Sequence, residues 1–401
     1  MRLTFLALGL TALSHASVPS QYLQKNQPAG DAPPSGRVDN TQMAYHSGQR
    51  DVDGNIQPES CPTIMIGNAE PGGDNKTGWQ QIPEVTGFDL RRLIVDEERN
   101  ATQPYYIENT KEPAEVKRVV ITIAGLLRNG WGYANYVRNS LLCAGARENV
   151  DADVNSTMVV APQWLNTDDT TAGAGTDDDI RFHKNTYQRG GPAVGPGDVK
   201  ISSYEVMDQL VKTFFDKDVY PNLERVVIAS HSLGAQMVHR YAMLRPTQPE
   251  DDKITFGVMN PGSYAWLVPE RPVKISNSSC SDPKDYDSWH YGIGPGKPTK
   301  FPKYVREEAL NDREGIKERY LSRNIYYGYG TADTQRGDHH CEASLQGDSH
   351  LERGRNFIKM LEDLPGGFPE NQSVHWVDGV GHEDYKMFHA ENMQRRMFLS
   401  E

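Results

Sequence analysis

Short apolar runs alternate along the chain with segments that carry apolar residues at helical spacing. Several runs are apolar on both faces, as in strands of a parallel sheet that helices cover. The predicted strands are 105–108, 119–124, 158–161, 226–229, 254–259, 325–329 and 374–377. The predicted helices are 133–144, 235–244, 350–364 and 384–398. This alternation favours an α/β sandwich, with a mostly parallel central sheet, helices on both faces and right-handed crossovers.

A capping box predicts the start of one further helix. Ser202-Ser203-Tyr204-Glu205 precedes a stripe of apolar residues at helical spacing. The stripe consists of Val206, Met207, Leu210, Val211, Phe214 and Phe215.

Two long insertions, residues 166–198 and 263–303, lack this periodicity. Loops at the carboxyl ends of strands shape the ligand site in such sheets. The first insertion carries two acidic clusters, Thr167-Asp168-Asp169 and Asp177-Asp178-Asp179. Their spacing does not match an EF-hand loop, so we favour a solvated surface loop over a calcium site.

The amino terminus is typical of a secretory signal peptide over residues 1–16. Arg2 gives the positive start, an apolar run follows to Leu13, and Ser14-His15-Ala16 matches a small-x-small cleavage site. The alternative is a buried amino-terminal helix. Residues 17–60, rich in polar residues and Pro, are expected to be a flexible leader or propeptide, and residues 61–401 the catalytic domain.

Composition narrows the class of protein. The 401 residues are 37% hydrophobic and 24% charged, with a net charge of −12. No basic run of nucleic-acid-binding density occurs, so we expect no nucleic-acid partner. No segment approaches the roughly 20 apolar residues that a membrane span needs. An exported enzyme without a membrane span fits these features.

Export has two further consequences. The Asn-x-Ser/Thr acceptors for glycosylation are Asn75, Asn100, Asn155, Asn277 and Asn371. Four cysteines, Cys61, Cys143, Cys280 and Cys341, predict two disulfides in an oxidising compartment. Three pairings are open. We favour Cys61–Cys143 with Cys280–Cys341, and the alternative is that one or more is a free buried thiol.

The strongest chemical signal is a serine between a predicted strand and a predicted helix. The β-branched run Val226-Val227-Ile228 ends in Ala229-Ser230-His231-Ser232-Leu233-Gly234, and an amphipathic segment follows. A serine at such a turn projects its hydroxyl beside the positive end of a helix. Ser232 is therefore a candidate nucleophile. The alternative is a chance Ser-x-Gly turn in a dinucleotide-binding fold, which normally carries more glycines.

This motif resembles the nucleophile elbow of the α/β-hydrolase-fold serine hydrolases. Ser230 replaces the usual first glycine, and the resemblance extends over residues 116–398. It implies the chain order nucleophile, acid, histidine. Asp333, at the end of the predicted strand 325–329, is the expected acid, with Asp338 as its rival. His382, after Gly379-Val380-Gly381, is the expected general base.

The resemblance also implies an oxyanion hole made by backbone N–H groups of Leu233 and Leu126. Arg128 and Asn129 either brace that loop, contact substrate or belong to a solvated loop. Trp164 and Tyr264 are further candidates for substrate contact, among aromatic residues expected at the rim of the site. These aromatics are Trp131, Trp164, Tyr264, Trp266 and Trp289.

Five further histidines need a different interpretation. His375 lies inside a predicted strand and is expected to be packed, and His231 is expected to face away from Ser232. His339-His340-Cys341 with His350 does not have the spacing of a zinc site. We therefore expect no metal and no cofactor.

The sequence thus predicts a secreted serine hydrolase that cleaves a small-molecule or polymeric carboxylic ester through an acyl-enzyme. The same residues also cleave amides, so a secreted peptidase or amidase is one alternative. A catalytically inactive binding protein with this fold is another. A group of exported hydrolases shares Val159-Val160-Ala161-Pro162-Gln163-Trp164 with this chain, and this likeness names no substrate.

Overall fold

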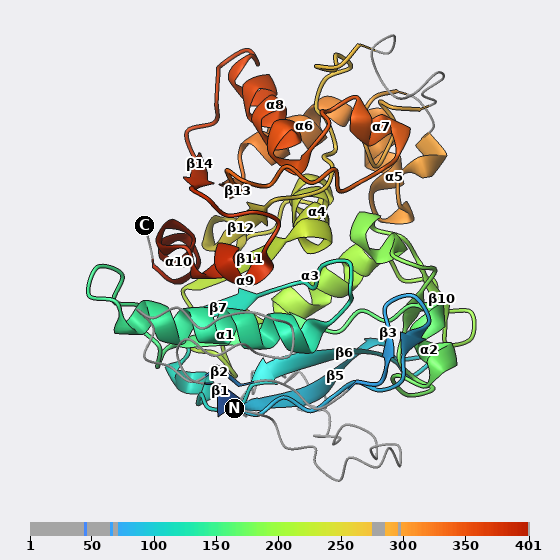
Figure 1. Ribbon diagram of the computed structural model, residues 1–401. Coiled ribbons are helices and arrows are strands. Elements are labelled where there is room, and N and C mark those ends of the chain that lie inside the picture. Colours follow the sequence, from blue (N-terminus) through green and yellow to red (C-terminus); the bar gives the residue numbers. More distant parts are fainter. Residues whose placement is uncertain (1–43, 46–64, 67–70, 275–284, 296–297, 400–401) are drawn as a thin grey trace, which may run out of the picture.

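A computed structural model describes residues 44–45, 65–66, 71–274, 285–295 and 298–399 (Figure 1). Its centre is an eight-stranded sheet with the order β14-β13-β12-β11-β7-β8-β6-β5. All neighbouring strands pair in parallel except β5 with β6 and β6 with β8. The strands are β5 (Phe88–Asp96), β6 (Ala101–Glu108), β7 (Arg118–Ile121), β8 (Thr157–Pro162), β11 (Arg225–His231), β12 (Ile254–Met259), β13 (Asn324–Gly330) and β14 (Gln372–Val377).

Helices cover both faces of the sheet, which confirms the predicted sandwich (Figure 1). Strand β11 shows why both faces of the sheet must be covered. Val226 and Ile228 are buried in the apolar core of one face, whereas Val227 and Ala229 are buried in the core of the other. The first face carries α3 (Ser203–Phe214), α4 (Ser232–Leu244), α6 (Arg313–Leu321) and α8 (His350–Glu362). The second face carries α1 (Gly130–Ala146), α9 (Asp384–His389) and α10 (Glu391–Phe398).

The first insertion is folded, and one aspartate of each acidic cluster is buried, which corrects our expectation of a solvated loop for these two residues; Asp168, Asp177 and Asp178 are exposed as expected. Asp169 and Asp179 are fully buried. Asp179 accepts hydrogen bonds from the Arg92 guanidinium at 2.9 and 3.0 Å and from the Thr102 hydroxyl at 2.8 Å. A buried carboxylate is stable only when it is paired in this way. The insertion contains α2 (Thr167–Ala172), β9 (Arg181–Phe182), η3 (Thr186–Arg189) and β10 (Ala193–Gly195).

Other boundaries also differ from the prediction. The expected helix 384–398 is two helices, because the backbone of Ala390 is extended between α9 and α10. The sequence analysis missed β5 at the edge of the sheet, α5 (Arg306–Asn311) and α6. Further short elements are β1 (Ala44–Tyr45), β2 (Met65–Ile66), β3 (Gly73–Asp74), β4 (Gly78–Trp79), η2 (Pro113–Glu115), η4 (Asp251–Lys253), η6 (Pro298–Lys300), η7 (Lys303–Val305) and α7 (Cys341–Ser344).

Most of the expected signal peptide and leader lies outside the described residues. Ala44–Tyr45, inside the expected leader, pairs with Met65–Ile66 as an antiparallel ribbon. Neither Cys143 nor Cys341 has a free thiol. Cys61 and Cys280 lie outside the described residues, so the disulfide pairing stays a prediction. Within the described part of the chain, no helix combines the length and apolar character that crossing a membrane requires.

The glycosylation sites also stay predictions. Asn100, Asn155 and Asn371 are exposed and Asn75 is half-buried, whereas Asn277 lies outside the described residues. The amide of Asn100 already donates a hydrogen bond to Asp178 at 3.0 Å. The amide of Asn371 likewise donates a hydrogen bond to the Ser322 carbonyl oxygen.

Candidate active site

Ser232 is the first residue of α4 and follows β11 without an intervening loop. Its φ of 58° lies in the left-handed region, which is uncommon for a residue other than glycine. Close packing holds this turn. A Cβ on Gly234 would lie only 2.1 Å from both the Ile123 carbonyl oxygen and the Ser230 hydroxyl. The small residues at both positions thus allow the strand-to-helix turn that presents Ser232, which is partly exposed.

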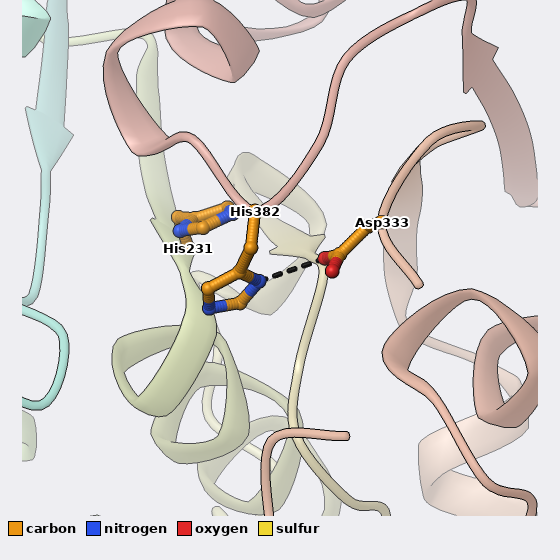
Figure 2. A group of neighbouring side chains, drawn as sticks. All are labelled: His231, Asp333 and His382. Atoms are coloured by element: carbon orange, nitrogen blue, oxygen red, sulfur yellow. Dashed lines mark hydrogen bonds and ion pairs between the residues drawn. The ribbon is translucent and has the colours of Figure 1, made fainter. Parts of the chain in front are cut away.

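The structure brings Ser232, His382 and Asp333 into a hydrogen-bonded chain. His382 Nε2 lies 2.8 Å from the Ser232 hydroxyl, and His382 Nδ1 lies 2.7 Å from Asp333 Oδ2. Figure 2 shows the Asp333 carboxylate pointing at the His382 ring. The three side chains lie in the segments that directly follow β11, β13 and β14, whose carboxyl ends lie along one edge of the sheet, with β12 between β11 and β13.

Asp333 is fully buried beneath this chain of hydrogen bonds. Burial alone raises the pKa of a carboxyl group. Here the contacts with His350 and His382 outweigh burial and hold the pKa of Asp333 well below its ordinary value. The carboxylate therefore stays ionised beside His382, where it fixes the imidazole tautomer with the proton on Nδ1.

His382 lies between two further histidines. The ring of His350 stacks on it with centroids 3.9 Å apart, and the ring of His231 lies 4.5 Å away. Burial and the neighbouring His382 lower the pKa of both His231 and His350. Both flanking rings are therefore neutral near pH 7 and add no positive charge beside the candidate base.

His350 has a second contact that the sequence analysis did not foresee. Its Nδ1 lies 3.1 Å from Asp333 Oδ1, the carboxylate oxygen that does not face His382. The approach is not aligned as a hydrogen bond, so the contact is electrostatic in nature. The sequence pointed to this contact only indirectly. His350 is the first residue of α8, and α8 begins after the loop that carries Asp333.

Asn260 connects the three segments of the site. Its amide nitrogen lies 3.2 Å from His231 Nε2, and its Oδ1 accepts a hydrogen bond of 2.9 Å from the backbone of Gly330. The same amide nitrogen lies 3.5 Å from the Gly381 carbonyl oxygen. Asn260 follows β12, is fully buried and has a φ of 44°. No sequence motif identified this residue.

The loop after β7 reaches the nucleophile, as the oxyanion-hole prediction requires. A Cβ on Gly125 would lie 3.7 Å from the Cβ of Ser232. Leu126 follows Gly125, and Leu233 is in the first turn of α4, where backbone N–H groups lack partners within the helix. Both N–H groups thus belong to segments that border Ser232, and their role as oxyanion donors stays a prediction.

Arg128 braces this loop instead of facing outward. Its guanidinium forms two hydrogen bonds of 2.8 Å with the buried carboxylate of Asp169. Asp169 in turn accepts a hydrogen bond from the backbone of Asn166, where α2 begins. Asn129, also buried, precedes α1. For Arg128 the structure favours a brace between the loop after β7 and the first insertion, and Asn129 is buried rather than solvated.

The aromatic candidates for substrate contact are packing residues. Trp164 is fully buried and stacks on Tyr187 with ring centroids 5.3 Å apart. Tyr264 is fully buried, stacks on Phe357 at 4.3 Å and donates a hydrogen bond to the Tyr329 hydroxyl. Neither ring presents a free face. The other expected rim residues are also buried, namely Trp131, Trp266 and Trp289.

Asp338, the rival acid, has partners other than His382. Its carboxylate accepts hydrogen bonds from Ser263 at 2.8 Å, from Tyr291 at 3.0 Å and from the backbone of His340 at 3.0 Å. His375 lies in β14 at the edge of the sheet and contacts Arg396 and Ser373. Neither residue joins the chain of hydrogen bonds around Ser232.

One group among the described residues has the geometry of a metal site, and it is the same site. His231, Asp333 and His382 offer ligand atoms that lie within 4.8 Å of one another (Figure 2). These atoms already have partners, because His382 contacts Ser232 and Asp333, and His231 Nε2 faces the amide nitrogen of Asn260. A bound metal would have to displace these hydrogen bonds, so the arrangement fits proton transfer better.

Comparison with known proteins supports the fold. The chain matches no family model and no curated protein sequence. Among solved structures it is similar to LpqC, a poly(3-hydroxybutyrate) depolymerase from Bordetella parapertussis. That likeness has 18% identity and a TM-score of 0.50, over 75% of this chain and 87% of that one.

Two further structures are similar over a comparable share of the chain. Poly(aspartic acid) hydrolase-1 from Sphingomonas sp. KT-1 has 17% identity and a TM-score of 0.45, over 74% of this chain and 93% of that one. The siderophore hydrolase EstA from Aspergillus nidulans has 11% identity and a TM-score of 0.42, over 79% and 95%. The likeness to LpqC, together with the sheet order and the elbow at Ser232, confirms the α/β-hydrolase fold.

Proposed function

We propose that this chain is a serine hydrolase that cleaves carboxylic esters through an acyl-enzyme. One observation carries the proposal: the unbroken chain of hydrogen bonds from Ser232 through His382 to the buried, ionised Asp333. A nucleophile, a base and a group that orients the base are the three parts that covalent acyl transfer needs.

The proposed reaction begins at the Ser232 hydroxyl. Its oxygen attacks the ester carbonyl carbon while His382 Nε2 takes its proton, and Asp333 stabilises the imidazolium that forms. The N–H groups of Leu233 and Leu126 would hold the negative oxygen of the tetrahedral intermediate. Collapse of this intermediate breaks the bond to the alcohol oxygen, which leaves with the proton from His382. Water then reacts with the acyl group by the same steps, which releases the acid and restores Ser232.

The surface beside the nucleophile supports an apolar group in the substrate. Leu126 and Leu127 follow Gly125 and are 54% and 47% exposed, which is unusual for large apolar side chains. The indole N–H of Trp79 donates a hydrogen bond of 2.8 Å to the Leu127 carbonyl oxygen and holds this loop. Two exposed apolar side chains in the loop that reaches Ser232 favour an ester with an apolar acyl or alcohol group.

Hydrolysis by the purified protein tests this proposal. The substrate panel would contain p-nitrophenyl esters of increasing chain length, the matching p-nitroanilides and poly(3-hydroxybutyrate), with Ser232→Ala as the inactive control. We expect ester turnover that depends on Ser232 and increases with acyl length over short chains. Preferential turnover of anilides would favour an amidase. No turnover of any substrate by the folded protein would favour an inactive binding protein.

We also propose that the protein is exported and processed. The support is the amino-terminal pattern of Arg2, the apolar run and Ser14-His15-Ala16. The absence of free thiols at Cys143 and Cys341 agrees with an oxidising compartment. Amino-terminal sequencing of the protein from the culture medium tests this proposal. A first residue near position 17 or near position 61 would distinguish loss of the signal alone from loss of the leader as well, whereas an intact Met1 in the cell fraction would contradict export.

A further inference from the structure

A hollow of about 670 Å³, away from the triad, lies between the two insertions. It is lined by the first insertion around β10 and by the end of the second insertion, just before α5, and β10 and α5 lie on the same side of the molecule (Figure 1). Its volume is within the range of roughly 300–1,000 Å³ that is usual for small-molecule sites. Neither Ser232 nor His382 lines it.

The lining of this hollow is strongly basic, although the whole chain carries a net charge of −12. Three lining histidines accompany the basic residues, and Glu342 is the only acidic residue among those that line it. The lysines and arginines of the lining are Arg189, Lys200, Lys300, Lys303 and Arg306. A concave surface that concentrates positive charge in this way attracts anions.

Most of these positive charges are not neutralised by carboxylates of the described residues. Lys300 is paired with Asp285 at 2.8 Å. Arg306 donates only to backbone carbonyls, those of Thr299 and Phe301. Arg189 lies 3.4 Å from His290 Nδ1, and no carboxylate in the described ranges pairs with Arg189 or Lys303. Several charges in one hollow therefore lack a counter-charge.

The buried wall of the hollow has the same property. Arg240 is fully buried and its guanidinium donates to neutral groups, the Gln188 side chain, the Ser263 hydroxyl and the His290 carbonyl. Burial, followed by the charges of Arg240 and Arg189, holds the pKa of His290 well below its usual value. Arg240 therefore adds a buried positive charge beside the lining residue His290, and its guanidinium is hydrogen-bonded to no carboxylate of the described residues.

We propose that this hollow is a binding site for a small organic molecule that carries two or more carboxylate or phosphate groups. Arg189 can bind one anionic group in a bidentate manner, and Lys200 and Lys303 lie on the opposite insertions to receive another. Trp289 and Phe301 line the same hollow, stack with ring centroids 5.5 Å apart and offer apolar contact to the carbon skeleton.

The site is separate from the triad but structurally connected to it. Arg240 lies two turns along α4 from Ser232, about 12 Å at 1.5 Å per residue. His340 lines the hollow and contacts Asp338, on the same loop as Asp333. The proposal does not depend on the proposed hydrolase activity, because binding is measurable without turnover.

Calorimetric titration of the full-length Ser232→Ala protein at low salt tests the site. The probes are citrate for carboxylates, fructose 1,6-bisphosphate for phosphates, and glucose as a neutral control. We expect one molecule of citrate or of the bisphosphate to bind per chain, with weaker binding at high salt, and no binding of glucose. Which of the two anions binds more tightly identifies the preferred group.

Charge-removing variants locate the binding. Arg189→Gln and the double variant Lys200→Gln/Lys303→Gln should each weaken binding roughly tenfold. Lys200 and Lys303 are exposed, so the double variant tests the site even if Arg189→Gln does not fold. The matched control, Lys117→Gln/Lys212→Gln, removes the same charge from two exposed positions elsewhere and should bind normally. The proposal would be overturned if neither anion bound at a probe concentration on the order of 10 mM. Equal weakening of binding by the control variant would also overturn it.

Discussion

The ring of His350 stacks on the ring of His382, with planes inclined by 15° and centroids 3.9 Å apart. The same residue contacts Asp333 through Nδ1 at 3.1 Å. His350 therefore restrains both partners of the central hydrogen bond without contacting Ser232. We expect it to be a positioning residue for the proposed reaction.

His350→Phe tests this role, because phenylalanine keeps a flat ring against His382 and removes the contact with Asp333. We expect kcat to fall by roughly tenfold or more, since small displacements of a general base are costly. KM should change little, because His350 is not placed to contact substrate. His375→Phe, at the edge of the sheet, is the control. Equal kcat values for the wild type and His350→Phe would contradict the positioning role.

The two candidate acids predict opposite outcomes for the same substitution. Asp333→Asn keeps the shape of the side chain but removes the acceptor that fixes the His382 tautomer, so kcat should fall by about 10⁴. Asp338→Asn should change kcat by less than roughly tenfold, because Asp338 binds Ser263, Tyr291 and His340 instead. Steady-state kinetics of both variants decide between them, and a larger loss in Asp338→Asn would show that the acid is misassigned.

Arg128 should matter for stability more than for substrate binding. Arg128→Ala leaves the buried Asp169 carboxylate without its charged partner, which should lower the free energy of unfolding by about 3–5 kcal/mol. Lys359→Ala, which removes an exposed pair with Asp363, should change it by less than about 1 kcal/mol. Denaturant unfolding measures both. A raised KM for Arg128→Ala with unchanged stability would instead indicate contact with substrate.

Buried histidines should make the protein less stable in mild acid. Burial lowers the pKa of His239 to about 3, whereas the unfolded chain takes up this proton near pH 6.5. Below pH 6.5 the unfolded state therefore binds more protons, so the stabilisation is complete above that pH and is lost as the pH falls. His239 alone should remove about 2 kcal/mol between pH 7 and pH 5.

Unfolding of His239→Leu at both pH values tests this assignment. The substitution removes the titrating group, so the difference in unfolding free energy between pH 7 and pH 5 should shrink by about 2 kcal/mol. An unchanged difference would show that His239 is not one of the groups that cause the acid sensitivity.

The sequence predicted the part of the site that depends on local structure. Ser232, Asp333 and His382 each follow a strand whose apolar run is easy to recognise, and the ends of neighbouring parallel strands meet at one edge. The antiparallel β5 escaped prediction because Arg91 and Arg92 interrupt its apolar alternation. Arg92 is paired with Asp179, which lies far along the chain, and Arg91 is paired with Asp89 of the same strand.

Contacts between distant segments account for what the sequence analysis predicted wrongly. Asp169 and Asp179 lie in segments with the composition of a solvated loop. Both are nevertheless buried, because Arg128 and Arg92 pair with their carboxylates. Trp164 and Tyr264 were expected at the rim because they lie in predicted loops, but both side chains pack into the core. Asn260 and His350 were missed because their roles depend on which side chains meet across the folded sheet.

The central claim is that Ser232 is a nucleophile activated by His382. The most direct measurement is intact mass, followed by peptide mapping, after treatment of the folded protein with a fluorophosphonate. We predict one adduct per chain, located on Ser232, absent in Ser232→Ala and strongly slowed in His382→Gln. A folded wild-type protein that forms no adduct, or forms it equally well in Ser232→Ala, would contradict the account.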